Sequence, residues 1–334
     1  MYMSGKTGFD SIIGHEDTIE RLKQAAGSGK ISHAYCIAGE AGVGKNHLAR
    51  RFAMAIQCEK HTGDACMECP SCKKAMSGNH PDIIYIRHEK AGSIGVDEIR
   101  EQLVNDIEIK PYESRFKIYI VPQAQLLTPQ AQNAMLKTLE EPPEYGCIML
   151  VTDNKDLLLP TISSRCSFIN VEAISEEQIK KYLVEEMLVP ENEARLQAAF
   201  AQGNIGKARM MASSPDFLEK LQECLRYLKK SKDLDSASRI ELDKKIALDK
   251  QGIYEYLDIF EMWFRDVLYY KASRDADKII FKEEVKALEE RAQVSSYEGI
   301  QVIIDSIHSA RMRLKANVTP ELVLELLFLT IYEN

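Results

Sequence analysis

The segment GEAGVGKN, residues 39–46, constrains the fold of this chain more than any other feature. It follows the apolar run AYCIAG (34–39) and precedes a helical pattern that begins at about His47. In this context the motif G-x-x-x-x-G-K binds phosphate, because the loop N–H groups and the helix N-terminus attract an anion. The candidate nucleotide-binding residues are Gly39, Gly42, Gly44, Lys45 and Asn46.

The surrounding pattern predicts an α/β domain followed by helices. Further buried-strand patterns occur at 82–86, 116–122, 146–152 and 167–172. Helical patterns lie between them at 47–57, 95–107 and 128–141, which is typical of layered α/β folds. After residue 172 the pattern is almost wholly helical. One apolar stripe at helical spacing predicts a helix that lies in a core or a subunit interface: Ile253, Tyr256, Leu257, Phe260, Phe264, Val267 and Leu268.

Two parts of a hydrolytic site are missing from the sequence. The residue after Lys45, where a Ser or Thr hydroxyl would hold magnesium, is Asn46. The strand pattern at 116–122 ends in Pro122-Gln123 where an acidic pair is expected, and no carboxylate occurs between Phe116 and Met135. Since hydrolysis needs both groups, we expect no ATP turnover by this chain. Passive binding of ATP or ADP by Lys45 and the glycines stays open.

Four cysteines with metal-ligand spacing form a second motif. Cys58, Cys66, Cys69 and Cys72 have the pattern C-x7-C-x2-C-x2-C and account for half of the eight cysteines. Four thiolates provide a closed tetrahedral set, which is typical of structural zinc. The alternative is a group of unrelated thiols. Acidic and basic residues both flank the motif, which favours stabilisation or protein contact over nucleic-acid binding.

Charge and hydropathy restrict the function classes. The 334 residues include 43 Lys and Arg against 51 Asp and Glu, a net charge of −8, which disfavours strong DNA binding by the chain in isolation. The N-terminal residues lack the apolar core of a signal peptide, and no apolar run approaches the length of a membrane span. We therefore expect a cytoplasmic protein without membrane contact.

Several motifs together carry a family resemblance. The stretch 9–45, the four-cysteine insert, LLTPQAQNAMLKTLEEPP (126–143) and TISSRC (161–166) occur in this order. On these motifs, over about residues 9–172, the chain resembles the clamp-loader branch of the AAA+ ATPases. Within that branch it is most similar to the delta-prime family of bacterial DNA polymerase III. The ATPase subunits tau/gamma keep the magnesium site that is missing here, and a nucleotide-sensing arginine where this chain has Gly206.

The resemblance implies three domains. These are an AAA+ P-loop domain at 1–172 with a zinc module at 58–72, a helical lid at 173–213, and a helical collar for oligomerisation at 214–334. It also implies a role for Arg165 in SSRC, as an arginine finger that acts in trans on ATP bound to a neighbouring subunit.

The implied function is that of a non-hydrolysing member of a five-subunit ring. Its partners would be tau/gamma and delta, and through the complex the sliding clamp and primed DNA. Two alternatives stay open: an active tau/gamma-like ATPase, and a zinc-dependent nucleic-acid-binding module with a vestigial loop.

Overall fold

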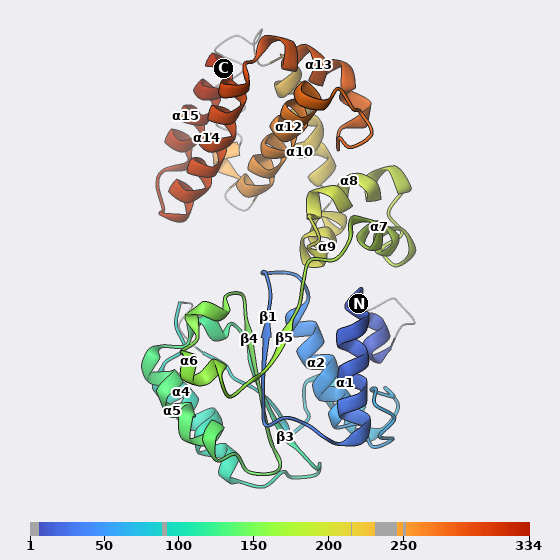
Figure 1. The fold of residues 1–334 in the computed structure, drawn as a ribbon, viewed down its shortest axis with the longest axis vertical. Coiled ribbons are helices and arrows are strands. Elements are labelled where there is room, and N and C mark those ends of the chain that lie inside the picture. The colour runs from blue at the N-terminus through green and yellow to red at the C-terminus, as the bar shows by residue number, and fades with distance from the viewer. Residues whose placement is uncertain (1–6, 89–91, 215, 231–245, 250–251) are drawn as a thin grey trace. The chain divides into compact units, whose positions relative to one another are not determined.

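The computed structural model of the protein describes residues 7–88, 92–214, 216–230, 246–249 and 252–334. The chain divides into two compact units (Figure 1). The first spans Met1–Leu188 and Ala201–Lys207, and the second spans Val189–Phe200 and Ala208–Asn334. The division into three domains at residues 172 and 213 stays a prediction.

A five-stranded parallel sheet forms the centre of the first unit. Its strands are β1 (Ala34–Ala38), β2 (Ile83–Tyr85), β3 (Lys117–Val121), β4 (Gly146–Thr152) and β5 (Ser167–Asn170). All five lie where the sequence predicted strands. The order is β2-β3-β4-β1-β5, so β1 lies between β4 and β5. The loops after these strands therefore meet at one edge of the sheet, where α/β folds bind ligands.

Helices cover both faces of this sheet. The helices of the first unit include α1 (Glu16–Ser28), α2 (Lys45–Ile56), α3 (Pro70–Ser77), α4 (Val96–Ile99), α5 (Pro129–Glu140), α6 (Pro160–Ser163) and α7 (Glu176–Glu185). Helices α1 and α2 lie on one face, and α4, α5 and α6 lie on the other (Figure 1). The first unit has two hydrophobic clusters, and alternate residues of β3 pack into each. Ile118 and Ile120 belong to the cluster that contains α2, and Tyr119 and Val121 belong to the cluster that contains α5. This alternation is the two-residue period of a strand buried on both faces.

The segment predicted as one helix at 95–107 has a mixed geometry. Helix α4 continues into a π-helical turn at Arg100–Val104 and a 3-10 turn at Asp106–Glu108. The deviation coincides with two contacts of the Asp106 carboxylate, to Lys117 Nζ (2.9 Å) and to the Tyr119 hydroxyl (2.7 Å), which attach this segment to β3. Four apolar residues are spaced for one face of the expected helix. Ile99, Leu103 and Ile107 are buried, and Val96 is half-buried.

In its described residues the second unit contains helices and no strand, as the sequence predicted. Its helices are α8 (Glu191–Ala201), α9 (Ile205–Ser213), α10 (Phe217–Lys230), α12 (Ile253–Ser273), α13 (Val285–Val294), α14 (Tyr297–Lys315) and α15 (Pro320–Glu333), with the ends of α8 and α9 shared with the first unit. The predicted stripe of α12 is buried except for Leu268, which is half-buried, so it forms core. In the described part of the chain, no helix combines the length and apolarity that crossing a membrane requires.

Candidate functional site

The glycine loop connects β1 to α2 as predicted, and each glycine has a structural reason. Gly42 and Gly44 have φ values of +84° and +103°, which side-chain-bearing residues rarely adopt. A Cβ on Gly39 would lie 2.1 Å from the Val171 carbonyl oxygen, so only glycine fits there. Helix α2 begins at Lys45, directly after the loop. The loop therefore has the strand–loop–helix geometry of a phosphate-binding site.

The ammonium group of the loop lysine already contacts acceptor groups of the chain itself. Lys45 is buried, with 4% of its side chain exposed. Its Nζ lies 2.7 Å from Oδ1 of Asp153 and donates to the Glu40 carbonyl at 2.5 Å. A phosphate that approached Lys45 would have to compete with a carboxylate for the same ammonium group. Asn46, the next residue, is exposed.

Asp153 is a site residue that the sequence reasoning missed. It directly follows β4, and two hydrogen bonds connect it to Gln125. The amide Nε2 of Gln125 donates to Asp153 Oδ2 at 3.0 Å, and the Asp153 N–H donates to Gln125 Oε1 at 3.1 Å. Gln125 lies just after β3, in the segment from Phe116 to Met135 that contains no carboxylate. The missed signal was an acid at the carboxyl end of the neighbouring strand, β4.

Residues at the start of α9 close over the loop. The Asn204 side chain donates to the Ala41 carbonyl at 2.6 Å, and the Gly206 N–H donates to the Gly42 carbonyl at 2.9 Å. A Cβ on Gly206 would lie 2.8 Å from that same carbonyl oxygen. Gly206 therefore permits a close backbone approach that a larger residue would prevent. The carbonyls of Ala41 and Gly42 therefore accept hydrogen bonds from this segment.

The four predicted cysteines come together. Their Sγ atoms all lie within 4.8 Å of one another. Tetrahedral zinc with bonds of about 2.3 Å needs sulfurs roughly 3.8 Å apart, so the set fits this metal. Backbone N–H groups donate to three of the sulfurs, at 3.3–3.4 Å. Such donation stabilises thiolates, the form that binds metal.

The local fold explains how two of these thiols are placed. Cys69 is the N-cap of α3, with Pro70 at the first helical position, so Cys72 lies one turn further along. Burial opposes charge on the sulfurs and raises the pKa of Cys58 and Cys72. Burial acts in the same direction on Cys66, but hydrogen bonds from the N–H groups of Glu68 and Cys69 and from the Cys58 and Cys69 thiols together outweigh it and lower the pKa of this thiol to about 6. A divalent cation would hold all four as thiolates.

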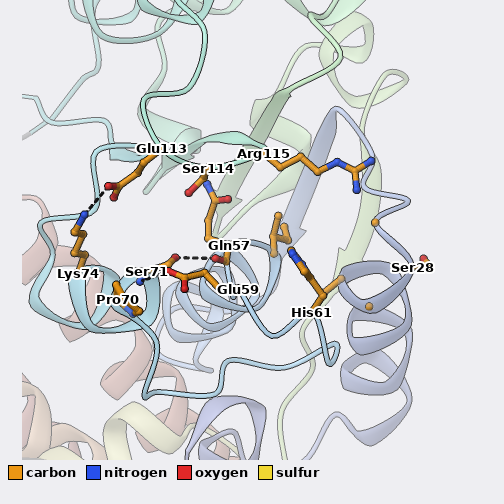
Figure 2. Close-up of a pocket in the computed structure, with 14 residues that line it drawn as sticks. Ser28, Gln57, Glu59, His61, Pro70, Ser71, Lys74, Glu113, Ser114 and Arg115 are labelled. Atoms are coloured by element: carbon orange, nitrogen blue, oxygen red, sulfur yellow. Dashed lines mark hydrogen bonds and ion pairs between the residues drawn. The ribbon is translucent and has the colours of Figure 1, made fainter.

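A cavity of about 390 Å³ lies beside the cysteine module (Figure 2). Figure 2 shows the ion pair between Lys74 and Glu113 on one side, with Nζ and Oε2 2.5 Å apart. Gln57, 5% exposed, donates through Nε2 to the Phe116 carbonyl at 2.6 Å, and its Oε1 has no hydrogen-bond partner among the described residues. The cavity shares no lining residue with the glycine loop or with Arg165.

Arg165 lies between α6 and β5, with a third of its side chain exposed. Its Nη2 lies 2.7 Å from Oε1 of Glu140, and Nη1 donates to the Thr161 carbonyl at 2.8 Å. The next residue, Cys166, packs against the core that contains α5, and burial raises the pKa of its thiol to about 12. Cys166 thus anchors the turn while the guanidinium of Arg165 stays at the surface.

Family models and relatives agree with this architecture. Residues 14–175 match the model for "DNA polymerase III, delta subunit", and residues 215–332 match the model for the C-terminal part of that subunit. The delta' subunit of DNA polymerase III from Bacillus subtilis is 29% identical over 91% of this chain and 92% of its own length.

Two gamma- and tau-type relatives are matched over less of their own length. The tau subunit from Bacillus subtilis is 27% identical over 98% of this chain. The gamma subunit from Buchnera aphidicola (subsp. Acyrthosiphon pisum) is 37% identical over 52% of this chain. The chain spans about half of that gamma subunit and 62% of that tau subunit. The two matched models, placed one after the other along the sequence, show that the chain belongs to the DNA polymerase III delta-subunit family of clamp-loader proteins.

Proposed function

We propose that the chain is a non-hydrolysing, delta-prime-like subunit of the DNA polymerase III clamp loader. In this role it completes a ring with tau/gamma and delta subunits in the cytoplasm. Through that complex it helps to load the sliding clamp on primed DNA. The observation that carries the proposal is the ion pair of Lys45 with Asp153, in a site that has Asn46 at the hydroxyl position and no acidic pair after β3.

The chemistry of the loop supports the absence of hydrolysis. Phosphoryl transfer needs magnesium on the β and γ phosphates and a group that orients the attacking water. Asn46 offers an amide in place of a hydroxyl, and Pro122-Gln123 follow β3 where an acidic pair would serve. Lys45 is neutralised by Asp153. We infer that the loop is a retained scaffold and that nucleotide binds to it weakly.

Arg165 is the residue through which the chain would contribute to catalysis. Its exposed guanidinium would stabilise charge that develops on the γ phosphate of ATP bound to a neighbouring tau/gamma subunit. Arginine fingers of this kind contribute about 10³ to 10⁵ in rate in NTPases. The position of Arg165 on a surface turn that Cys166 anchors suits such a role, because the side chain is accessible while its backbone is held.

We also propose that the four cysteines hold a structural zinc ion. A closed set of four thiolates leaves no position for substrate, so the metal would contribute folding free energy and no chemistry. The surface of the module carries both positive and negative side chains, in the ion pairs Lys60–Glu68 and Lys74–Glu113. This mixture favours a structural role over nucleic-acid binding.

The C-terminal helices would form the oligomerisation collar of the proposed three-domain division. Helix α15 buries one apolar face, yet Leu322, Leu326 and Leu329 on its other side are 43–52% exposed. Exposed leucines at this helical spacing are typical of a surface that another subunit covers. We assign this stripe to contacts with the tau/gamma and delta subunits.

Nucleotide binding and steady-state hydrolysis by the purified chain, with and without magnesium, test the proposal. We expect weak binding and no turnover. Magnesium-dependent turnover that disappears in Lys45→Ala would establish an active tau/gamma-like ATPase instead, the alternative that the 37% identity to the gamma subunit favours. Salt-sensitive DNA binding by the isolated chain would support a nucleic-acid-binding module.

A further inference from the structure

We propose that Glu140 is a positioning residue for Arg165: it holds the guanidinium in the orientation in which it meets the neighbouring nucleotide. The inference rests on the proposed role of Arg165 as an arginine finger in trans. It adds a second residue to that function, on a different element of the fold. The relationship is the contact between the last residue of α5 and the turn that follows α6.

The contact leaves the arginine able to bind phosphate. Arg165 donates from Nη2 to Glu140, and from Nη1 to the Thr161 carbonyl and, at 3.5 Å, to the Ser164 hydroxyl. A guanidinium has five N–H donors in a rigid plane, so donors remain for an incoming phosphate. Arg165 can therefore contact a γ phosphate without leaving Glu140. This makes the pair an orienting contact and not a latch that must open.

The helix dipole indicates that Glu140 does not stabilise α5. Glu140 is the last residue of the helix, where the negative end of the helix dipole disfavours a carboxylate. Glu141 follows at the C-cap and adds a second negative charge. Arg165 supplies the compensating cation for Glu140. Glu140 and Glu141 thus form a matched pair of adjacent carboxylates, of which Glu140 has the ion pair with Arg165.

Helix α5 also holds the segment that leads to Arg165. Gln132, in the first turns of α5, is 2% exposed and accepts a hydrogen bond from the Leu159 N–H at 2.7 Å. Its Nε2 donates to the Leu157 carbonyl at 3.2 Å. The buried amide of Gln132 and the carboxylate of Glu140 therefore attach the 157–165 segment at both ends of one rigid helix. The backbone and the side chain of Arg165 share this frame.

Loss of the contact between Glu140 and Arg165 should affect ATP turnover and not folding. An arginine free in solvent loses side-chain conformational freedom when it binds phosphate, and a pre-oriented one loses less. The side chains of Glu140 and Arg165 are 50% and 33% exposed, so the pair adds little to stability. Removing Glu140 should therefore lower the kcat of the neighbouring ATP site. The KM for ATP should not change, because the finger acts mainly in the transition state.

The test is a mutant cycle in the reconstituted ring with tau/gamma and delta subunits, sliding clamp and primed DNA. The variants are Glu140→Ala, Glu140→Gln, Arg165→Ala, the Glu140→Ala/Arg165→Ala double variant, and Glu141→Ala as matched control. We expect Glu140→Ala to remove most of the kcat that Arg165→Ala removes. Glu140→Gln, which keeps an acceptor, should restore part of it, and Glu141→Ala should match the wild type. In the Arg165→Ala background, Glu140→Ala should have no further effect.

Two results would overturn the assignment of Glu140. One is wild-type kcat in Glu140→Ala. The other is an equal fold-loss from Glu140→Ala with and without Arg165, which would show a role independent of the arginine. Wild-type turnover in Arg165→Ala would instead refute the finger itself, and that result is read from a separate variant. Thermal unfolding and ring assembly of each variant show whether a lost rate reflects misfolding.

Discussion

Nζ of Lys45 and Oδ1 of Asp153 lie 2.7 Å apart, and the lysine side chain is almost completely buried. The lysine ammonium group that a phosphate-binding loop would offer to phosphate is thus balanced by a carboxylate of the same chain. Asp153 in turn forms two hydrogen bonds with Gln125: its carboxylate accepts one, and its backbone N–H donates the other. The loop keeps its shape, but its charge is satisfied internally.

Removal of this carboxylate should strengthen nucleotide binding. In Asp153→Ala, Lys45 loses its counter-ion, and a phosphate no longer meets a negative charge at that site. We expect ADP and ATP to bind about tenfold more tightly than to the wild type, as measured by titration with a fluorescent analogue. Hydrolysis should stay absent. Asp156→Ala, an exposed acid nearby, is the control and should not change the affinity. Equal affinity of Asp153→Ala and wild type would show that Asp153 does not block the loop.

A side chain at Gly206 should destabilise the first unit. In Gly206→Ala the new methyl group would lie 2.8 Å from the Gly42 carbonyl oxygen, so the contact between α9 and the loop must loosen. We expect a loss of about 1–3 kcal/mol in the free energy of unfolding, measured by urea denaturation. Gly92→Ala is the control, because a Cβ there meets no atom within 4 Å. A wild-type midpoint for Gly206→Ala would contradict the close approach.

Zinc binding should depend on Cys66 and not on Cys166, a cysteine of similar exposure. Cys66 and Cys166 are both half-buried, but only Cys66 belongs to the four-sulfur cluster. We expect Cys66→Ser to lose the metal and to unfold at a lower temperature, whereas Cys166→Ser should retain one zinc per chain. Metal analysis of the purified proteins measures this directly. A metal-free wild type whose melting temperature does not respond to added zinc would refute the site.

His80 should make the first unit less stable in mild acid. Burial lowers the pKa of this imidazole below its usual value of 6.5. Its Nδ1 accepts the Asp82 N–H at 3.1 Å, and a protonated Nδ1 would face that donor. The unfolded state therefore binds more protons below pH 6.5, and stability falls as the pH drops through 6.5 toward the folded-state pKa. Above pH 6.5 the effect is absent.

Urea denaturation of wild type and His80→Gln between pH 5 and pH 8 isolates this contribution. Other titrating groups are common to both proteins, so the difference between the two curves reports on His80. We expect the wild type to lose its advantage over the variant as the pH falls below 6.5. A difference that is constant with pH would show that His80 does not titrate within this range.

The exposed stripe of α15 should support assembly. In Leu326→Glu a charge would be buried wherever another subunit covers this face, and we expect the affinity of the chain for the tau/gamma–delta complex to fall by about tenfold or more. Analytical ultracentrifugation of the mixture measures it. Ile109→Glu, which alters an apolar residue of similar exposure in the first unit, should assemble normally. Normal assembly of Leu326→Glu would place the interface on another face.

Local sequence patterns were sufficient for much of this fold. The five strands, the loop between β1 and α2, and the start of α5 after Thr128 follow from side-chain periodicity, glycine and proline, which act over a few residues. The spacing of the four cysteines likewise predicted a cluster, because two short C-x2-C steps bring sulfurs together within one turn. The absence of an acidic pair after β3 could be read from the order of residues.

Tertiary structure decided the contacts between segments that are far apart in sequence. No local pattern links Lys45 to Asp153, Asn204 to Ala41, or Glu140 to Arg165. Strand order places β1 beside β4 and so brings an acid to the loop lysine, and α5 carries a carboxylate to an arginine 25 residues later. The sequence by itself determined which elements form and which catalytic groups are missing, because periodicity and residue type act locally. The packing of the sheet and its helices decided which charges meet, because electrostatic pairing depends on distance in space.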